Sequence, residues 1–272
     1  MVNLAQQAAY HYGEQKKLQI PGVTLTFVHA ENSRDQVGWH WHENPHVTFI
    51  LQGDVIEGTK REVHNCSAGS VLFHSSFEPH YNLKLEGNTR CFHLDFVPEY
   101  LNDVTSNSRR LQGIFAVADP HVKLLCYKIF TEAVVSDDVS AASIHGLALE
   151  ILGRLTFTEA ATSSSRPSWV ARLEEILRSE LPDQLSLAEL SRELSIHPVH
   201  LSRSFSQYFR CTFGEYVRRV RVQQSLAIMP HKNLSLTEIA FKCGFADQSH
   251  FSRSFRQIIG VSPSTYRKLL SN

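Results

Sequence analysis

The sequence predicts an α+β chain of two domains: an amino-terminal antiparallel β-barrel with linking helices, and a carboxy-terminal all-α domain. At 272 residues the chain is long enough for both. Through about residue 105, short runs of alternating hydrophobicity are separated by Gly, Pro and Asn, which is typical of antiparallel strands. From about residue 119, apolar residues recur at helical spacing instead. The clearest strand-like runs are residues 23–28, 47–51, 70–73 and 90–96.

The zero net charge conceals two halves of opposite sign. Residues 1–165 hold 12 Lys and Arg against 18 Asp and Glu, and residues 166–272 hold 15 against 9. A basic second half favours a polyanionic partner. The five cysteines form no C-x-x-C pair, no apolar run is long enough for a bilayer, and the start lacks a secretory signal pattern. We therefore expect a cytoplasmic protein with no membrane partner.

The middle of the chain, residues 106–160, is assigned to linking helices. Apolar residues at helical spacing over 119–159 predict two antiparallel helices with a break near residues 136–138. Their apolar stripes suggest pairing with a second subunit, hence a homodimer, or packing on the barrel of the same chain. Residues 161–167 are small and polar, as in a flexible linker, and residues 168–272 form the second domain.

The carboxy-terminal part contains an internal repeat with a period near 50 residues. Residues 186–190 (SLAEL) and 235–239 (SLTEI) share the S-x-x-E capping box that begins a helix. Each of these helices ends at a matched position, Ser195 or Gly244, where a sharp turn needs a left-handed backbone that glycine adopts more easily. A second helix follows in each copy, at 200–205 (HLSRSF) and 250–255 (HFSRSF). Short helix, turn and second helix, twice, predict two helix-turn-helix units.

One face of each second helix carries small, amide and arginine side chains. Arg pairs bidentately with guanine and Gln with adenine, while small residues allow close approach to base edges. We therefore expect double-stranded DNA as the partner. A helical repeat that binds another protein through a solvated basic face is the alternative. The expected DNA-reading residues are Val199, Ser202, Arg203, Gln207, Gln248, Ser249, Ser252, Arg253 and Gln257.

Residues 168–272 resemble the DNA-binding domain of the AraC/XylS family of transcription regulators. The resemblance is carried by residues 239–245 (IAFKCGF), 248–255 (QSHFSRSF) and 260–267 (GVSPSTYR). It implies a seven-helix domain whose two helix-turn-helix units enter adjacent major grooves, with RNA polymerase as a further partner if the protein is an activator. His197 departs from the family, which usually has a capping Ser there, and His is a poor cap.

The amino-terminal half holds a histidine pattern on the predicted strands. Residues 38–46 (GWHWHENPH) and 69–80 (GSVLFHSSFEPH) resemble the two cupin motifs, so the barrel is expected to be cupin-like. Cupin enzymes typically bind a metal through two His and a Glu of the first motif and one His of the second. Here His46 occupies the Glu position, which leaves the candidate set His40, His42, His46 and His80.

These four histidines allow two interpretations. Imidazole suits Zn, Cu, Fe or Ni, so the set could hold a divalent metal. Alternatively, the four side chains line a pocket and form hydrogen bonds with a polar effector. His64, His74 and His93 are expected to be surface or core residues.

The sequence favours a one-component transcription regulator, not an enzyme, whose barrel senses a small molecule and whose second domain reads DNA. A metal-dependent cupin enzyme fused to a DNA-binding domain is the alternative.

Overall fold

The computed structural model describes residues 14–30, 36–84, 88–99, 111–135, 139–156, 167–179, 186–209 and 211–270. The chain divides into two compact units, residues 1–157 and 158–272. Most of the expected linker, residues 161–166, lies outside the described residues. None of the helices in the described ranges has the length and apolar character that crossing a membrane requires.

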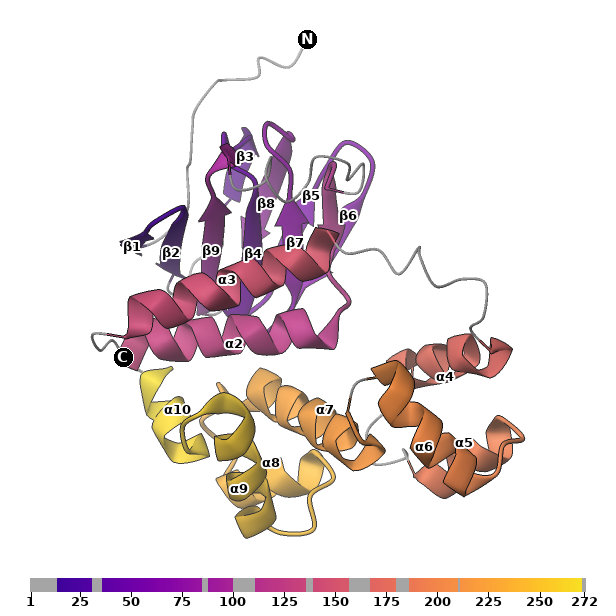
Figure 1. Ribbon diagram of the computed structural model, residues 1–272. Helices are drawn as coiled ribbons and strands as arrows, with labels where there is room; N and C mark the ends of the chain where they lie inside the picture. Colours follow the sequence, from indigo (N-terminus) through magenta and orange to yellow (C-terminus); the bar gives the residue numbers. More distant parts are fainter. Residues whose placement is uncertain are drawn as a thin grey trace. The chain divides into compact units, whose positions relative to one another are not determined.

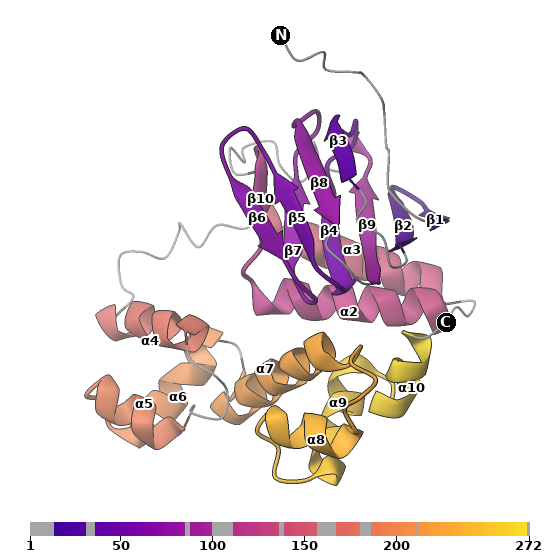
Figure 2. The ribbon, with the colours of Figure 1, turned by 180° about the vertical axis from the view of Figure 1, so that it is seen from behind.

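The first unit contains two antiparallel sheets. A six-stranded sheet has the order β1-β2-β9-β4-β7-β10 and a four-stranded sheet the order β3-β8-β5-β6 (Figures 1 and 2). All four runs named from the sequence are strands. The strands are β1 (Glu14–Ile20), β2 (Val23–Ala30), β3 (Gln36–His40), β4 (His46–Gln52), β5 (Val55–Gly58), β6 (Val63–Cys66), β7 (Val71–His74), β8 (His80–Lys84), β9 (Thr89–Phe96) and β10 (Ile114–Ala116).

Two helices, α2 (Pro120–Val135) and α3 (Ser140–Thr156), cover the outer face of the six-stranded sheet (Figure 1). Phe27 and Phe49 of the sheet place their rings 6.2 and 4.7 Å from those of Phe130 and Tyr127 on α2. Because side chains alternate along a strand, the other face of the sheet points into the barrel. That inner face of β4 carries His46, Thr48 and Ile50, which line a cavity.

The apolar stripes of the two helices are buried inside the first unit. Val122, Ile129, Ile144 and Ile151 are all fully buried. The structure therefore shows the packing alternative that the sequence left open, and the stripes no longer argue for a second subunit. Strand β10 pairs with β7, which places residues 114–116 in the barrel sheet and not among the linking helices.

The second unit is helical throughout its described residues and contains seven helices, as the family resemblance implies. They are α4 (Ser168–Ser179), α5 (Leu187–Glu193), α6 (Pro198–Phe209), α7 (Phe213–Ile228), α8 (Leu236–Lys242), α9 (Gln248–Ile259) and α10 (Pro263–Leu269). Helices α5 and α6 form one helix-turn-helix unit, α8 and α9 form the other, and α7 lies between them in the chain. The first helices are 49 residues apart and the second helices 50, as the repeat predicts.

Each helix-turn-helix unit has its own apolar core. Leu201 and Phe205, four residues apart on α6, are fully buried with Leu190 of α5 in one cluster. Phe251 and Phe255 repeat this arrangement on α9. Residues four apart lie on the same face of a helix, so these pairs direct the opposite face outward.

Candidate DNA interface and barrel cavity

The first helix-turn-helix unit is fixed by a cap and a tight turn. The Ser186 side chain accepts a hydrogen bond from the Glu189 amide at 3.1 Å and begins α5. After α5, Ser195 adopts a positive φ of 54°, and the Ile196 amide donates to the Ser191 carbonyl at 3.0 Å. This is the sharp turn that the sequence predicted, made by a residue other than glycine.

The second unit repeats these contacts at equivalent positions. Ser235 and Glu238 form a complete capping box at the start of α8. Gly244 has a φ of 76°, and the Phe245 amide donates to the Ala240 carbonyl at 3.0 Å. A Cβ atom on Gly244 would lie 3.1 Å from Nε of Arg221 on α7, so this guanidinium lies close above the turn.

The two second helices begin with different caps. Asp247 accepts a hydrogen bond from the His250 amide at 2.7 Å at the start of α9. The corresponding residue before α6 is His197, whose Nδ1 accepts from the Val199 amide at 3.3 Å. The imidazole therefore does cap α6, through a longer bond than the aspartate makes.

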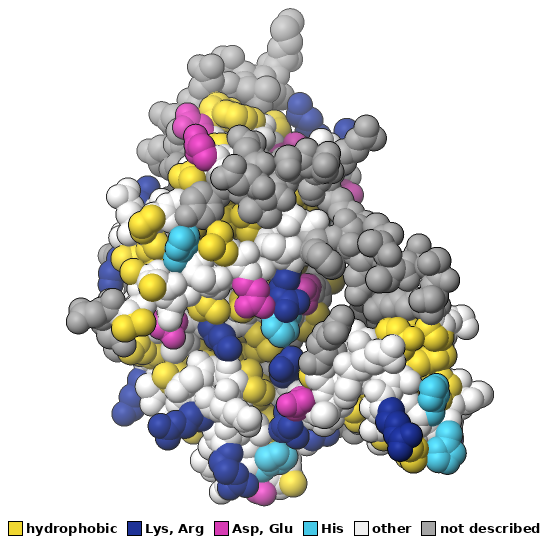
Figure 3. All heavy atoms as spheres, viewed as in Figure 1, with side chains coloured by type: hydrophobic (Ala, Val, Ile, Leu, Met, Phe, Trp, Pro, Cys, Tyr) yellow, Lys and Arg dark blue, Asp and Glu magenta, His cyan; other side chains and the backbone are white. Residues whose placement is uncertain are grey.

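The predicted DNA-reading residues all lie on α6 and α9 and reach solvent. Eight are exposed and Ser252 is half-buried. Gln248 already accepts a hydrogen bond at 2.6 Å from the hydroxyl of Thr237 on α8, which orients its amide. Figure 3 shows Lys and Arg side chains gathered on this unit. The two helices thus present a polar, basic surface opposite their buried phenylalanines.

The barrel of the first unit encloses a small cavity between its two sheets. About 30 Å³ of space is open to the centre of a water molecule, enough for roughly two waters. Polar side chains from β4 to β9 and from the segment just after β3 share its lining with aliphatic ones. The polar lining residues are His42, His46, Thr48, Glu57, Cys66, His74, His80, Asn82, Cys91 and His93.

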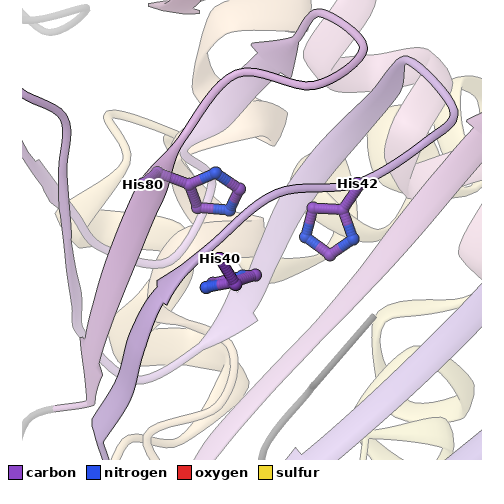
Figure 4. Close-up of side chains that lie close together, drawn as sticks. All are labelled: His40, His42 and His80. Carbon is purple, nitrogen blue, oxygen red and sulfur yellow. The ribbon is translucent and has the colours of Figure 1, made fainter. Parts of the chain in front are cut away.

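Three of the four predicted histidines converge on one point. His40 on β3, His42 just after it and His80 on β8 each offer a ring nitrogen within 4.8 Å of the others (Figure 4). All three are buried, and the pairing of β3 with β8 sets His40 opposite His80. His46 is not part of this group of ligand atoms: its ring lies 4.6 Å from that of His42 and stacks on His74 at 4.1 Å.

Backbone carbonyls orient two of these rings. Nδ1 of His40 lies 2.8 Å from the Gly38 carbonyl, and Nδ1 of His80 lies 2.9 Å from the Glu78 carbonyl. A carbonyl only accepts, so Nδ1 carries the proton and Nε2 the lone pair in each neutral ring. Metal-binding histidines are commonly held in this way. The three imidazoles therefore fit a divalent metal ion, as the cupin resemblance implies.

Two buried cavity residues were not recognised as site residues from the sequence. Glu57 on β5 and His74 on β7 are each 2% exposed. Glu57 Oε1 lies 3.2 Å from His74 Nδ1, without the alignment of a hydrogen bond, and both atoms are buried with no hydrogen-bond partner. His74 was expected to be a surface or core residue, and no sequence motif distinguishes Glu57 from a solvated carboxylate.

Burial dominates the ionisation of the cavity groups. It raises the pKa of the Glu57 carboxyl to about 8, against the opposing effect of the hydrogen bond from Asn82. It lowers the pKa of His74 well below its ordinary value, and the nearby histidines add to that effect. Burial raises the pKa of Cys66 and Cys91 to about 12, so both remain thiols at neutral pH.

Comparisons with known proteins agree with this architecture. A helix-turn-helix domain family model matches residues 190–269, which span both units. The transcriptional activator AarP of Providencia stuartii is 32% identical over 91 residues, 34% of this chain and 67% of that protein. The fold and these matches define a protein with a double helix-turn-helix domain. The chain belongs to the AraC/XylS family of transcription regulators.

Two further relatives show how far the similarity extends. The Msm operon regulatory protein of Streptococcus mutans is 28% identical over 111 residues, 41% of this chain and 40% of that protein. The transcriptional activator RhaR of Mannheimia succiniciproducens is 21% identical over 239 residues, 84% of this chain and 86% of that protein. The chain therefore spans less than half the length of some curated relatives and most of the length of others.

Proposed function

We propose that this chain is a one-component transcription regulator that binds double-stranded DNA through α6 and α9. The observation that carries the proposal is that both helices repeat, 50 residues apart, a buried apolar pair at the same two positions and the same outward Arg and Gln. Arg203 and Arg253 hydrogen-bond guanine edges, and Gln207 and Gln257 hydrogen-bond adenine edges. The base-contacting set is Val199, Ser202, Arg203, Gln207, Gln248, Ser249, Ser252, Arg253 and Gln257.

The barrel is proposed to be the sensory domain, with α2 and α3, which lie within the expected linking segment 106–160, connecting it to the DNA-binding domain. The proposed effector-binding region is the cavity that His42, His46 and His80 line, with the ring of His40 packed 4.2 Å from that of His80. An effector changes DNA binding only if it interacts differently with two arrangements of the protein. We place this regulator in the cytoplasm, with RNA polymerase as a partner if it activates transcription. Val135 of α2, Val139 just before α3 and Leu149 of α3 are exposed, and they are the apolar surface proposed for a second subunit.

The test is selection of binding sites from a pool of randomised duplexes by the full chain. We expect two conserved half-sites about one helical turn, roughly 10 base pairs, apart. We also expect the affinity for the selected site to fall steeply with salt, because phosphate contacts release counterions. Selection of no common sequence, with an affinity that does not depend on salt, would contradict the proposal and favour a helical module that binds protein.

The convergence of His40, His42 and His80 also supports a second candidate, a metal-dependent enzyme fused to a DNA-binding domain. A bound divalent ion would supply Lewis-acid chemistry there. This candidate predicts turnover of a small substrate that His42→Ala abolishes. Regulation of DNA binding by the same ion, without turnover, would exclude it.

A further inference from the structure

A second group of potential ligands, called the inner group below, lines the same cavity and shares His80 with the three imidazoles of the cupin motifs. Glu57, His74 and His80 each offer an atom within 4.8 Å of the other two. They come from β5, β7 and β8, so the two sheets bring them together from opposite sides. Two imidazoles and a carboxylate are a donor set typical of divalent transition metals.

One oxygen of the Glu57 carboxylate and one nitrogen of the His74 imidazole lack the hydrogen bond that burial normally demands. Glu57 Oε1 and His74 Nδ1 form no hydrogen bond, and each belongs to a residue that is only 2% exposed. Buried polar atoms of this kind are rare, and one explanation is an ion that completes them. His74 is held in place from its other nitrogen, because Nε2 lies 3.2 Å from the Thr48 hydroxyl.

The distance between Glu57 Oε1 and His74 Nδ1 fits two neighbouring ligands of one ion. The two atoms lie 3.2 Å apart. With metal–ligand distances of about 2.1 Å, neighbouring ligands are about 3.0 Å apart in an octahedron and about 3.4 Å apart in a tetrahedron. The observed value lies between the two. The cavity also has room for about one or two waters to complete the coordination.

The inner group and the three imidazoles cannot both bind an ion at the same time, because both include His80. Its Nδ1 bonds the Glu78 carbonyl, so Nε2 is its one lone pair for a metal, and one ion at a time can use it. A divalent ion held by His40, His42 and His80 would be buried among neutral groups. At the inner position the ion displaces the proton that burial keeps on Glu57, and the resulting carboxylate charge offsets part of the cost of burying the ion.

We propose that Glu57, His74 and His80 bind a divalent transition metal ion inside the barrel, and that this ion is the effector. The second part rests on the proposed regulatory function. The first cupin motif usually supplies a Glu ligand at the position that His46 occupies here. In this chain Glu57 on β5 would supply the carboxylate instead. An ion with one or two waters also suits the size of the cavity, which is too small for an organic effector.

The test is titration of the metal-stripped full chain with Co²⁺ alone, followed by its visible absorption bands and by calorimetry. We expect one Co²⁺ per chain. Glu57→Gln, which keeps the shape of the side chain and removes its charge, should weaken binding by at least about tenfold. The matched variant His40→Gln removes a ligand of the three imidazoles but none of the inner group, so it should leave the affinity for Co²⁺ within about threefold. His64→Gln, outside the cavity, serves as the control.

The pattern of the variants separates the alternatives. An affinity lost in His40→Gln and kept in Glu57→Gln would place the ion among the three imidazoles and overturn the proposal. Equal losses in both, or no stoichiometric Co²⁺ in the parent chain, would overturn it as well. His74→Gln should repeat the loss seen with Glu57→Gln, and thermal melts of the metal-free variants show whether each is folded.

A measurement of DNA binding by the metal-free chain separates a failure of the metal proposal from a failure of the proposed regulatory function. If the chain selects a DNA sequence but binds no Co²⁺, only the metal proposal fails. If it binds Co²⁺ through Glu57 but no specific DNA, the regulatory function fails. If both bind and Co²⁺ leaves the affinity for the selected site unchanged, the ion is not the effector.

Discussion

The two helix-turn-helix turns allow a matched pair of substitutions with opposite expected signs. Ser195 and Gly244 occupy equivalent positions, with φ angles of 54° and 76°. A side chain in this left-handed region costs about 1–2 kcal/mol, which glycine does not incur. Replacing Ser195 by Gly removes that strain. Replacing Gly244 by Ala adds it and also brings a Cβ to 3.1 Å from Arg221 Nε.

The net effects follow from the two states of the chain. Glycine has more backbone conformational entropy than alanine in the unfolded state, which lowers the stability of the folded state by about 0.4–1 kcal/mol. This loss opposes the relief of strain. Ser195→Gly should therefore stabilise the first unit by up to about 1 kcal/mol. Gly244→Ala should destabilise the second unit by about 1–2 kcal/mol, because only part of the strain is offset and Arg221 must shift.

Hydrogen exchange measured by mass spectrometry resolves these effects by segment in a chain of two domains. Peptides covering residues 186–209 should exchange up to about fivefold more slowly in Ser195→Gly, the factor for about 1 kcal/mol. Peptides covering 235–259 should exchange faster in Gly244→Ala. The same sign for both variants would refute the assignment of Ser195 as a strained turn residue.

Three further predictions rest on caps and on burial. His197→Asp should stabilise the first unit by about 0.5–1 kcal/mol, because a carboxylate caps better than the 3.3 Å imidazole contact; unchanged exchange at α6 would contradict this. Ser235→Ala should destabilise α8 by about 1 kcal/mol in the same assay, and no change would mean that its capping box contributes nothing. Burial raises the pKa of Asp95 to about 6 from 3.8, so its contribution to stability is complete below pH 3.8 and is lost as the pH rises to 6. Asp95→Asn should thus match the parent in urea unfolding near pH 3.5 and exceed it by up to about 3 kcal/mol above pH 6, whereas an equal difference at both values would contradict the shift.

The helical domain could be predicted from the sequence because its signals are local. Ser235 and Glu238, three residues apart, are sufficient to predict a capped helix, and the structure contains that capping box. Gly244 marks the turn by its conformational freedom alone. His197 was expected to be a poor cap by residue type, and its Nδ1 accepts the Val199 amide at 3.3 Å, a longer bond than the 2.7 Å bond that Asp247 accepts. The sequence does not specify this contact, because it depends on the rotamer that the imidazole adopts.

The cavity was predicted only in part, because strand pairing assembles it. His40 and His80 are 40 residues apart in sequence, and the motifs connected them only through their resemblance to a known barrel. Glu57 enters the cavity because β5 pairs with β8, with Glu57 opposite Asn82. His46 meets His74 because β4 pairs with β7. Register between distant strands is not encoded in any short motif, so these two contacts could not be read from the sequence.

The most direct test of DNA reading by both helix-turn-helix units is the affinity of Arg203→Ala and Arg253→Ala for the selected duplex and for duplexes mutated one base pair at a time. Each variant should lose about 1–3 kcal/mol on the selected duplex and should stop discriminating at one guanine, in a different half-site for each arginine. If both variants bind selected and mutated duplexes as the parent chain does, α6 and α9 do not read the DNA.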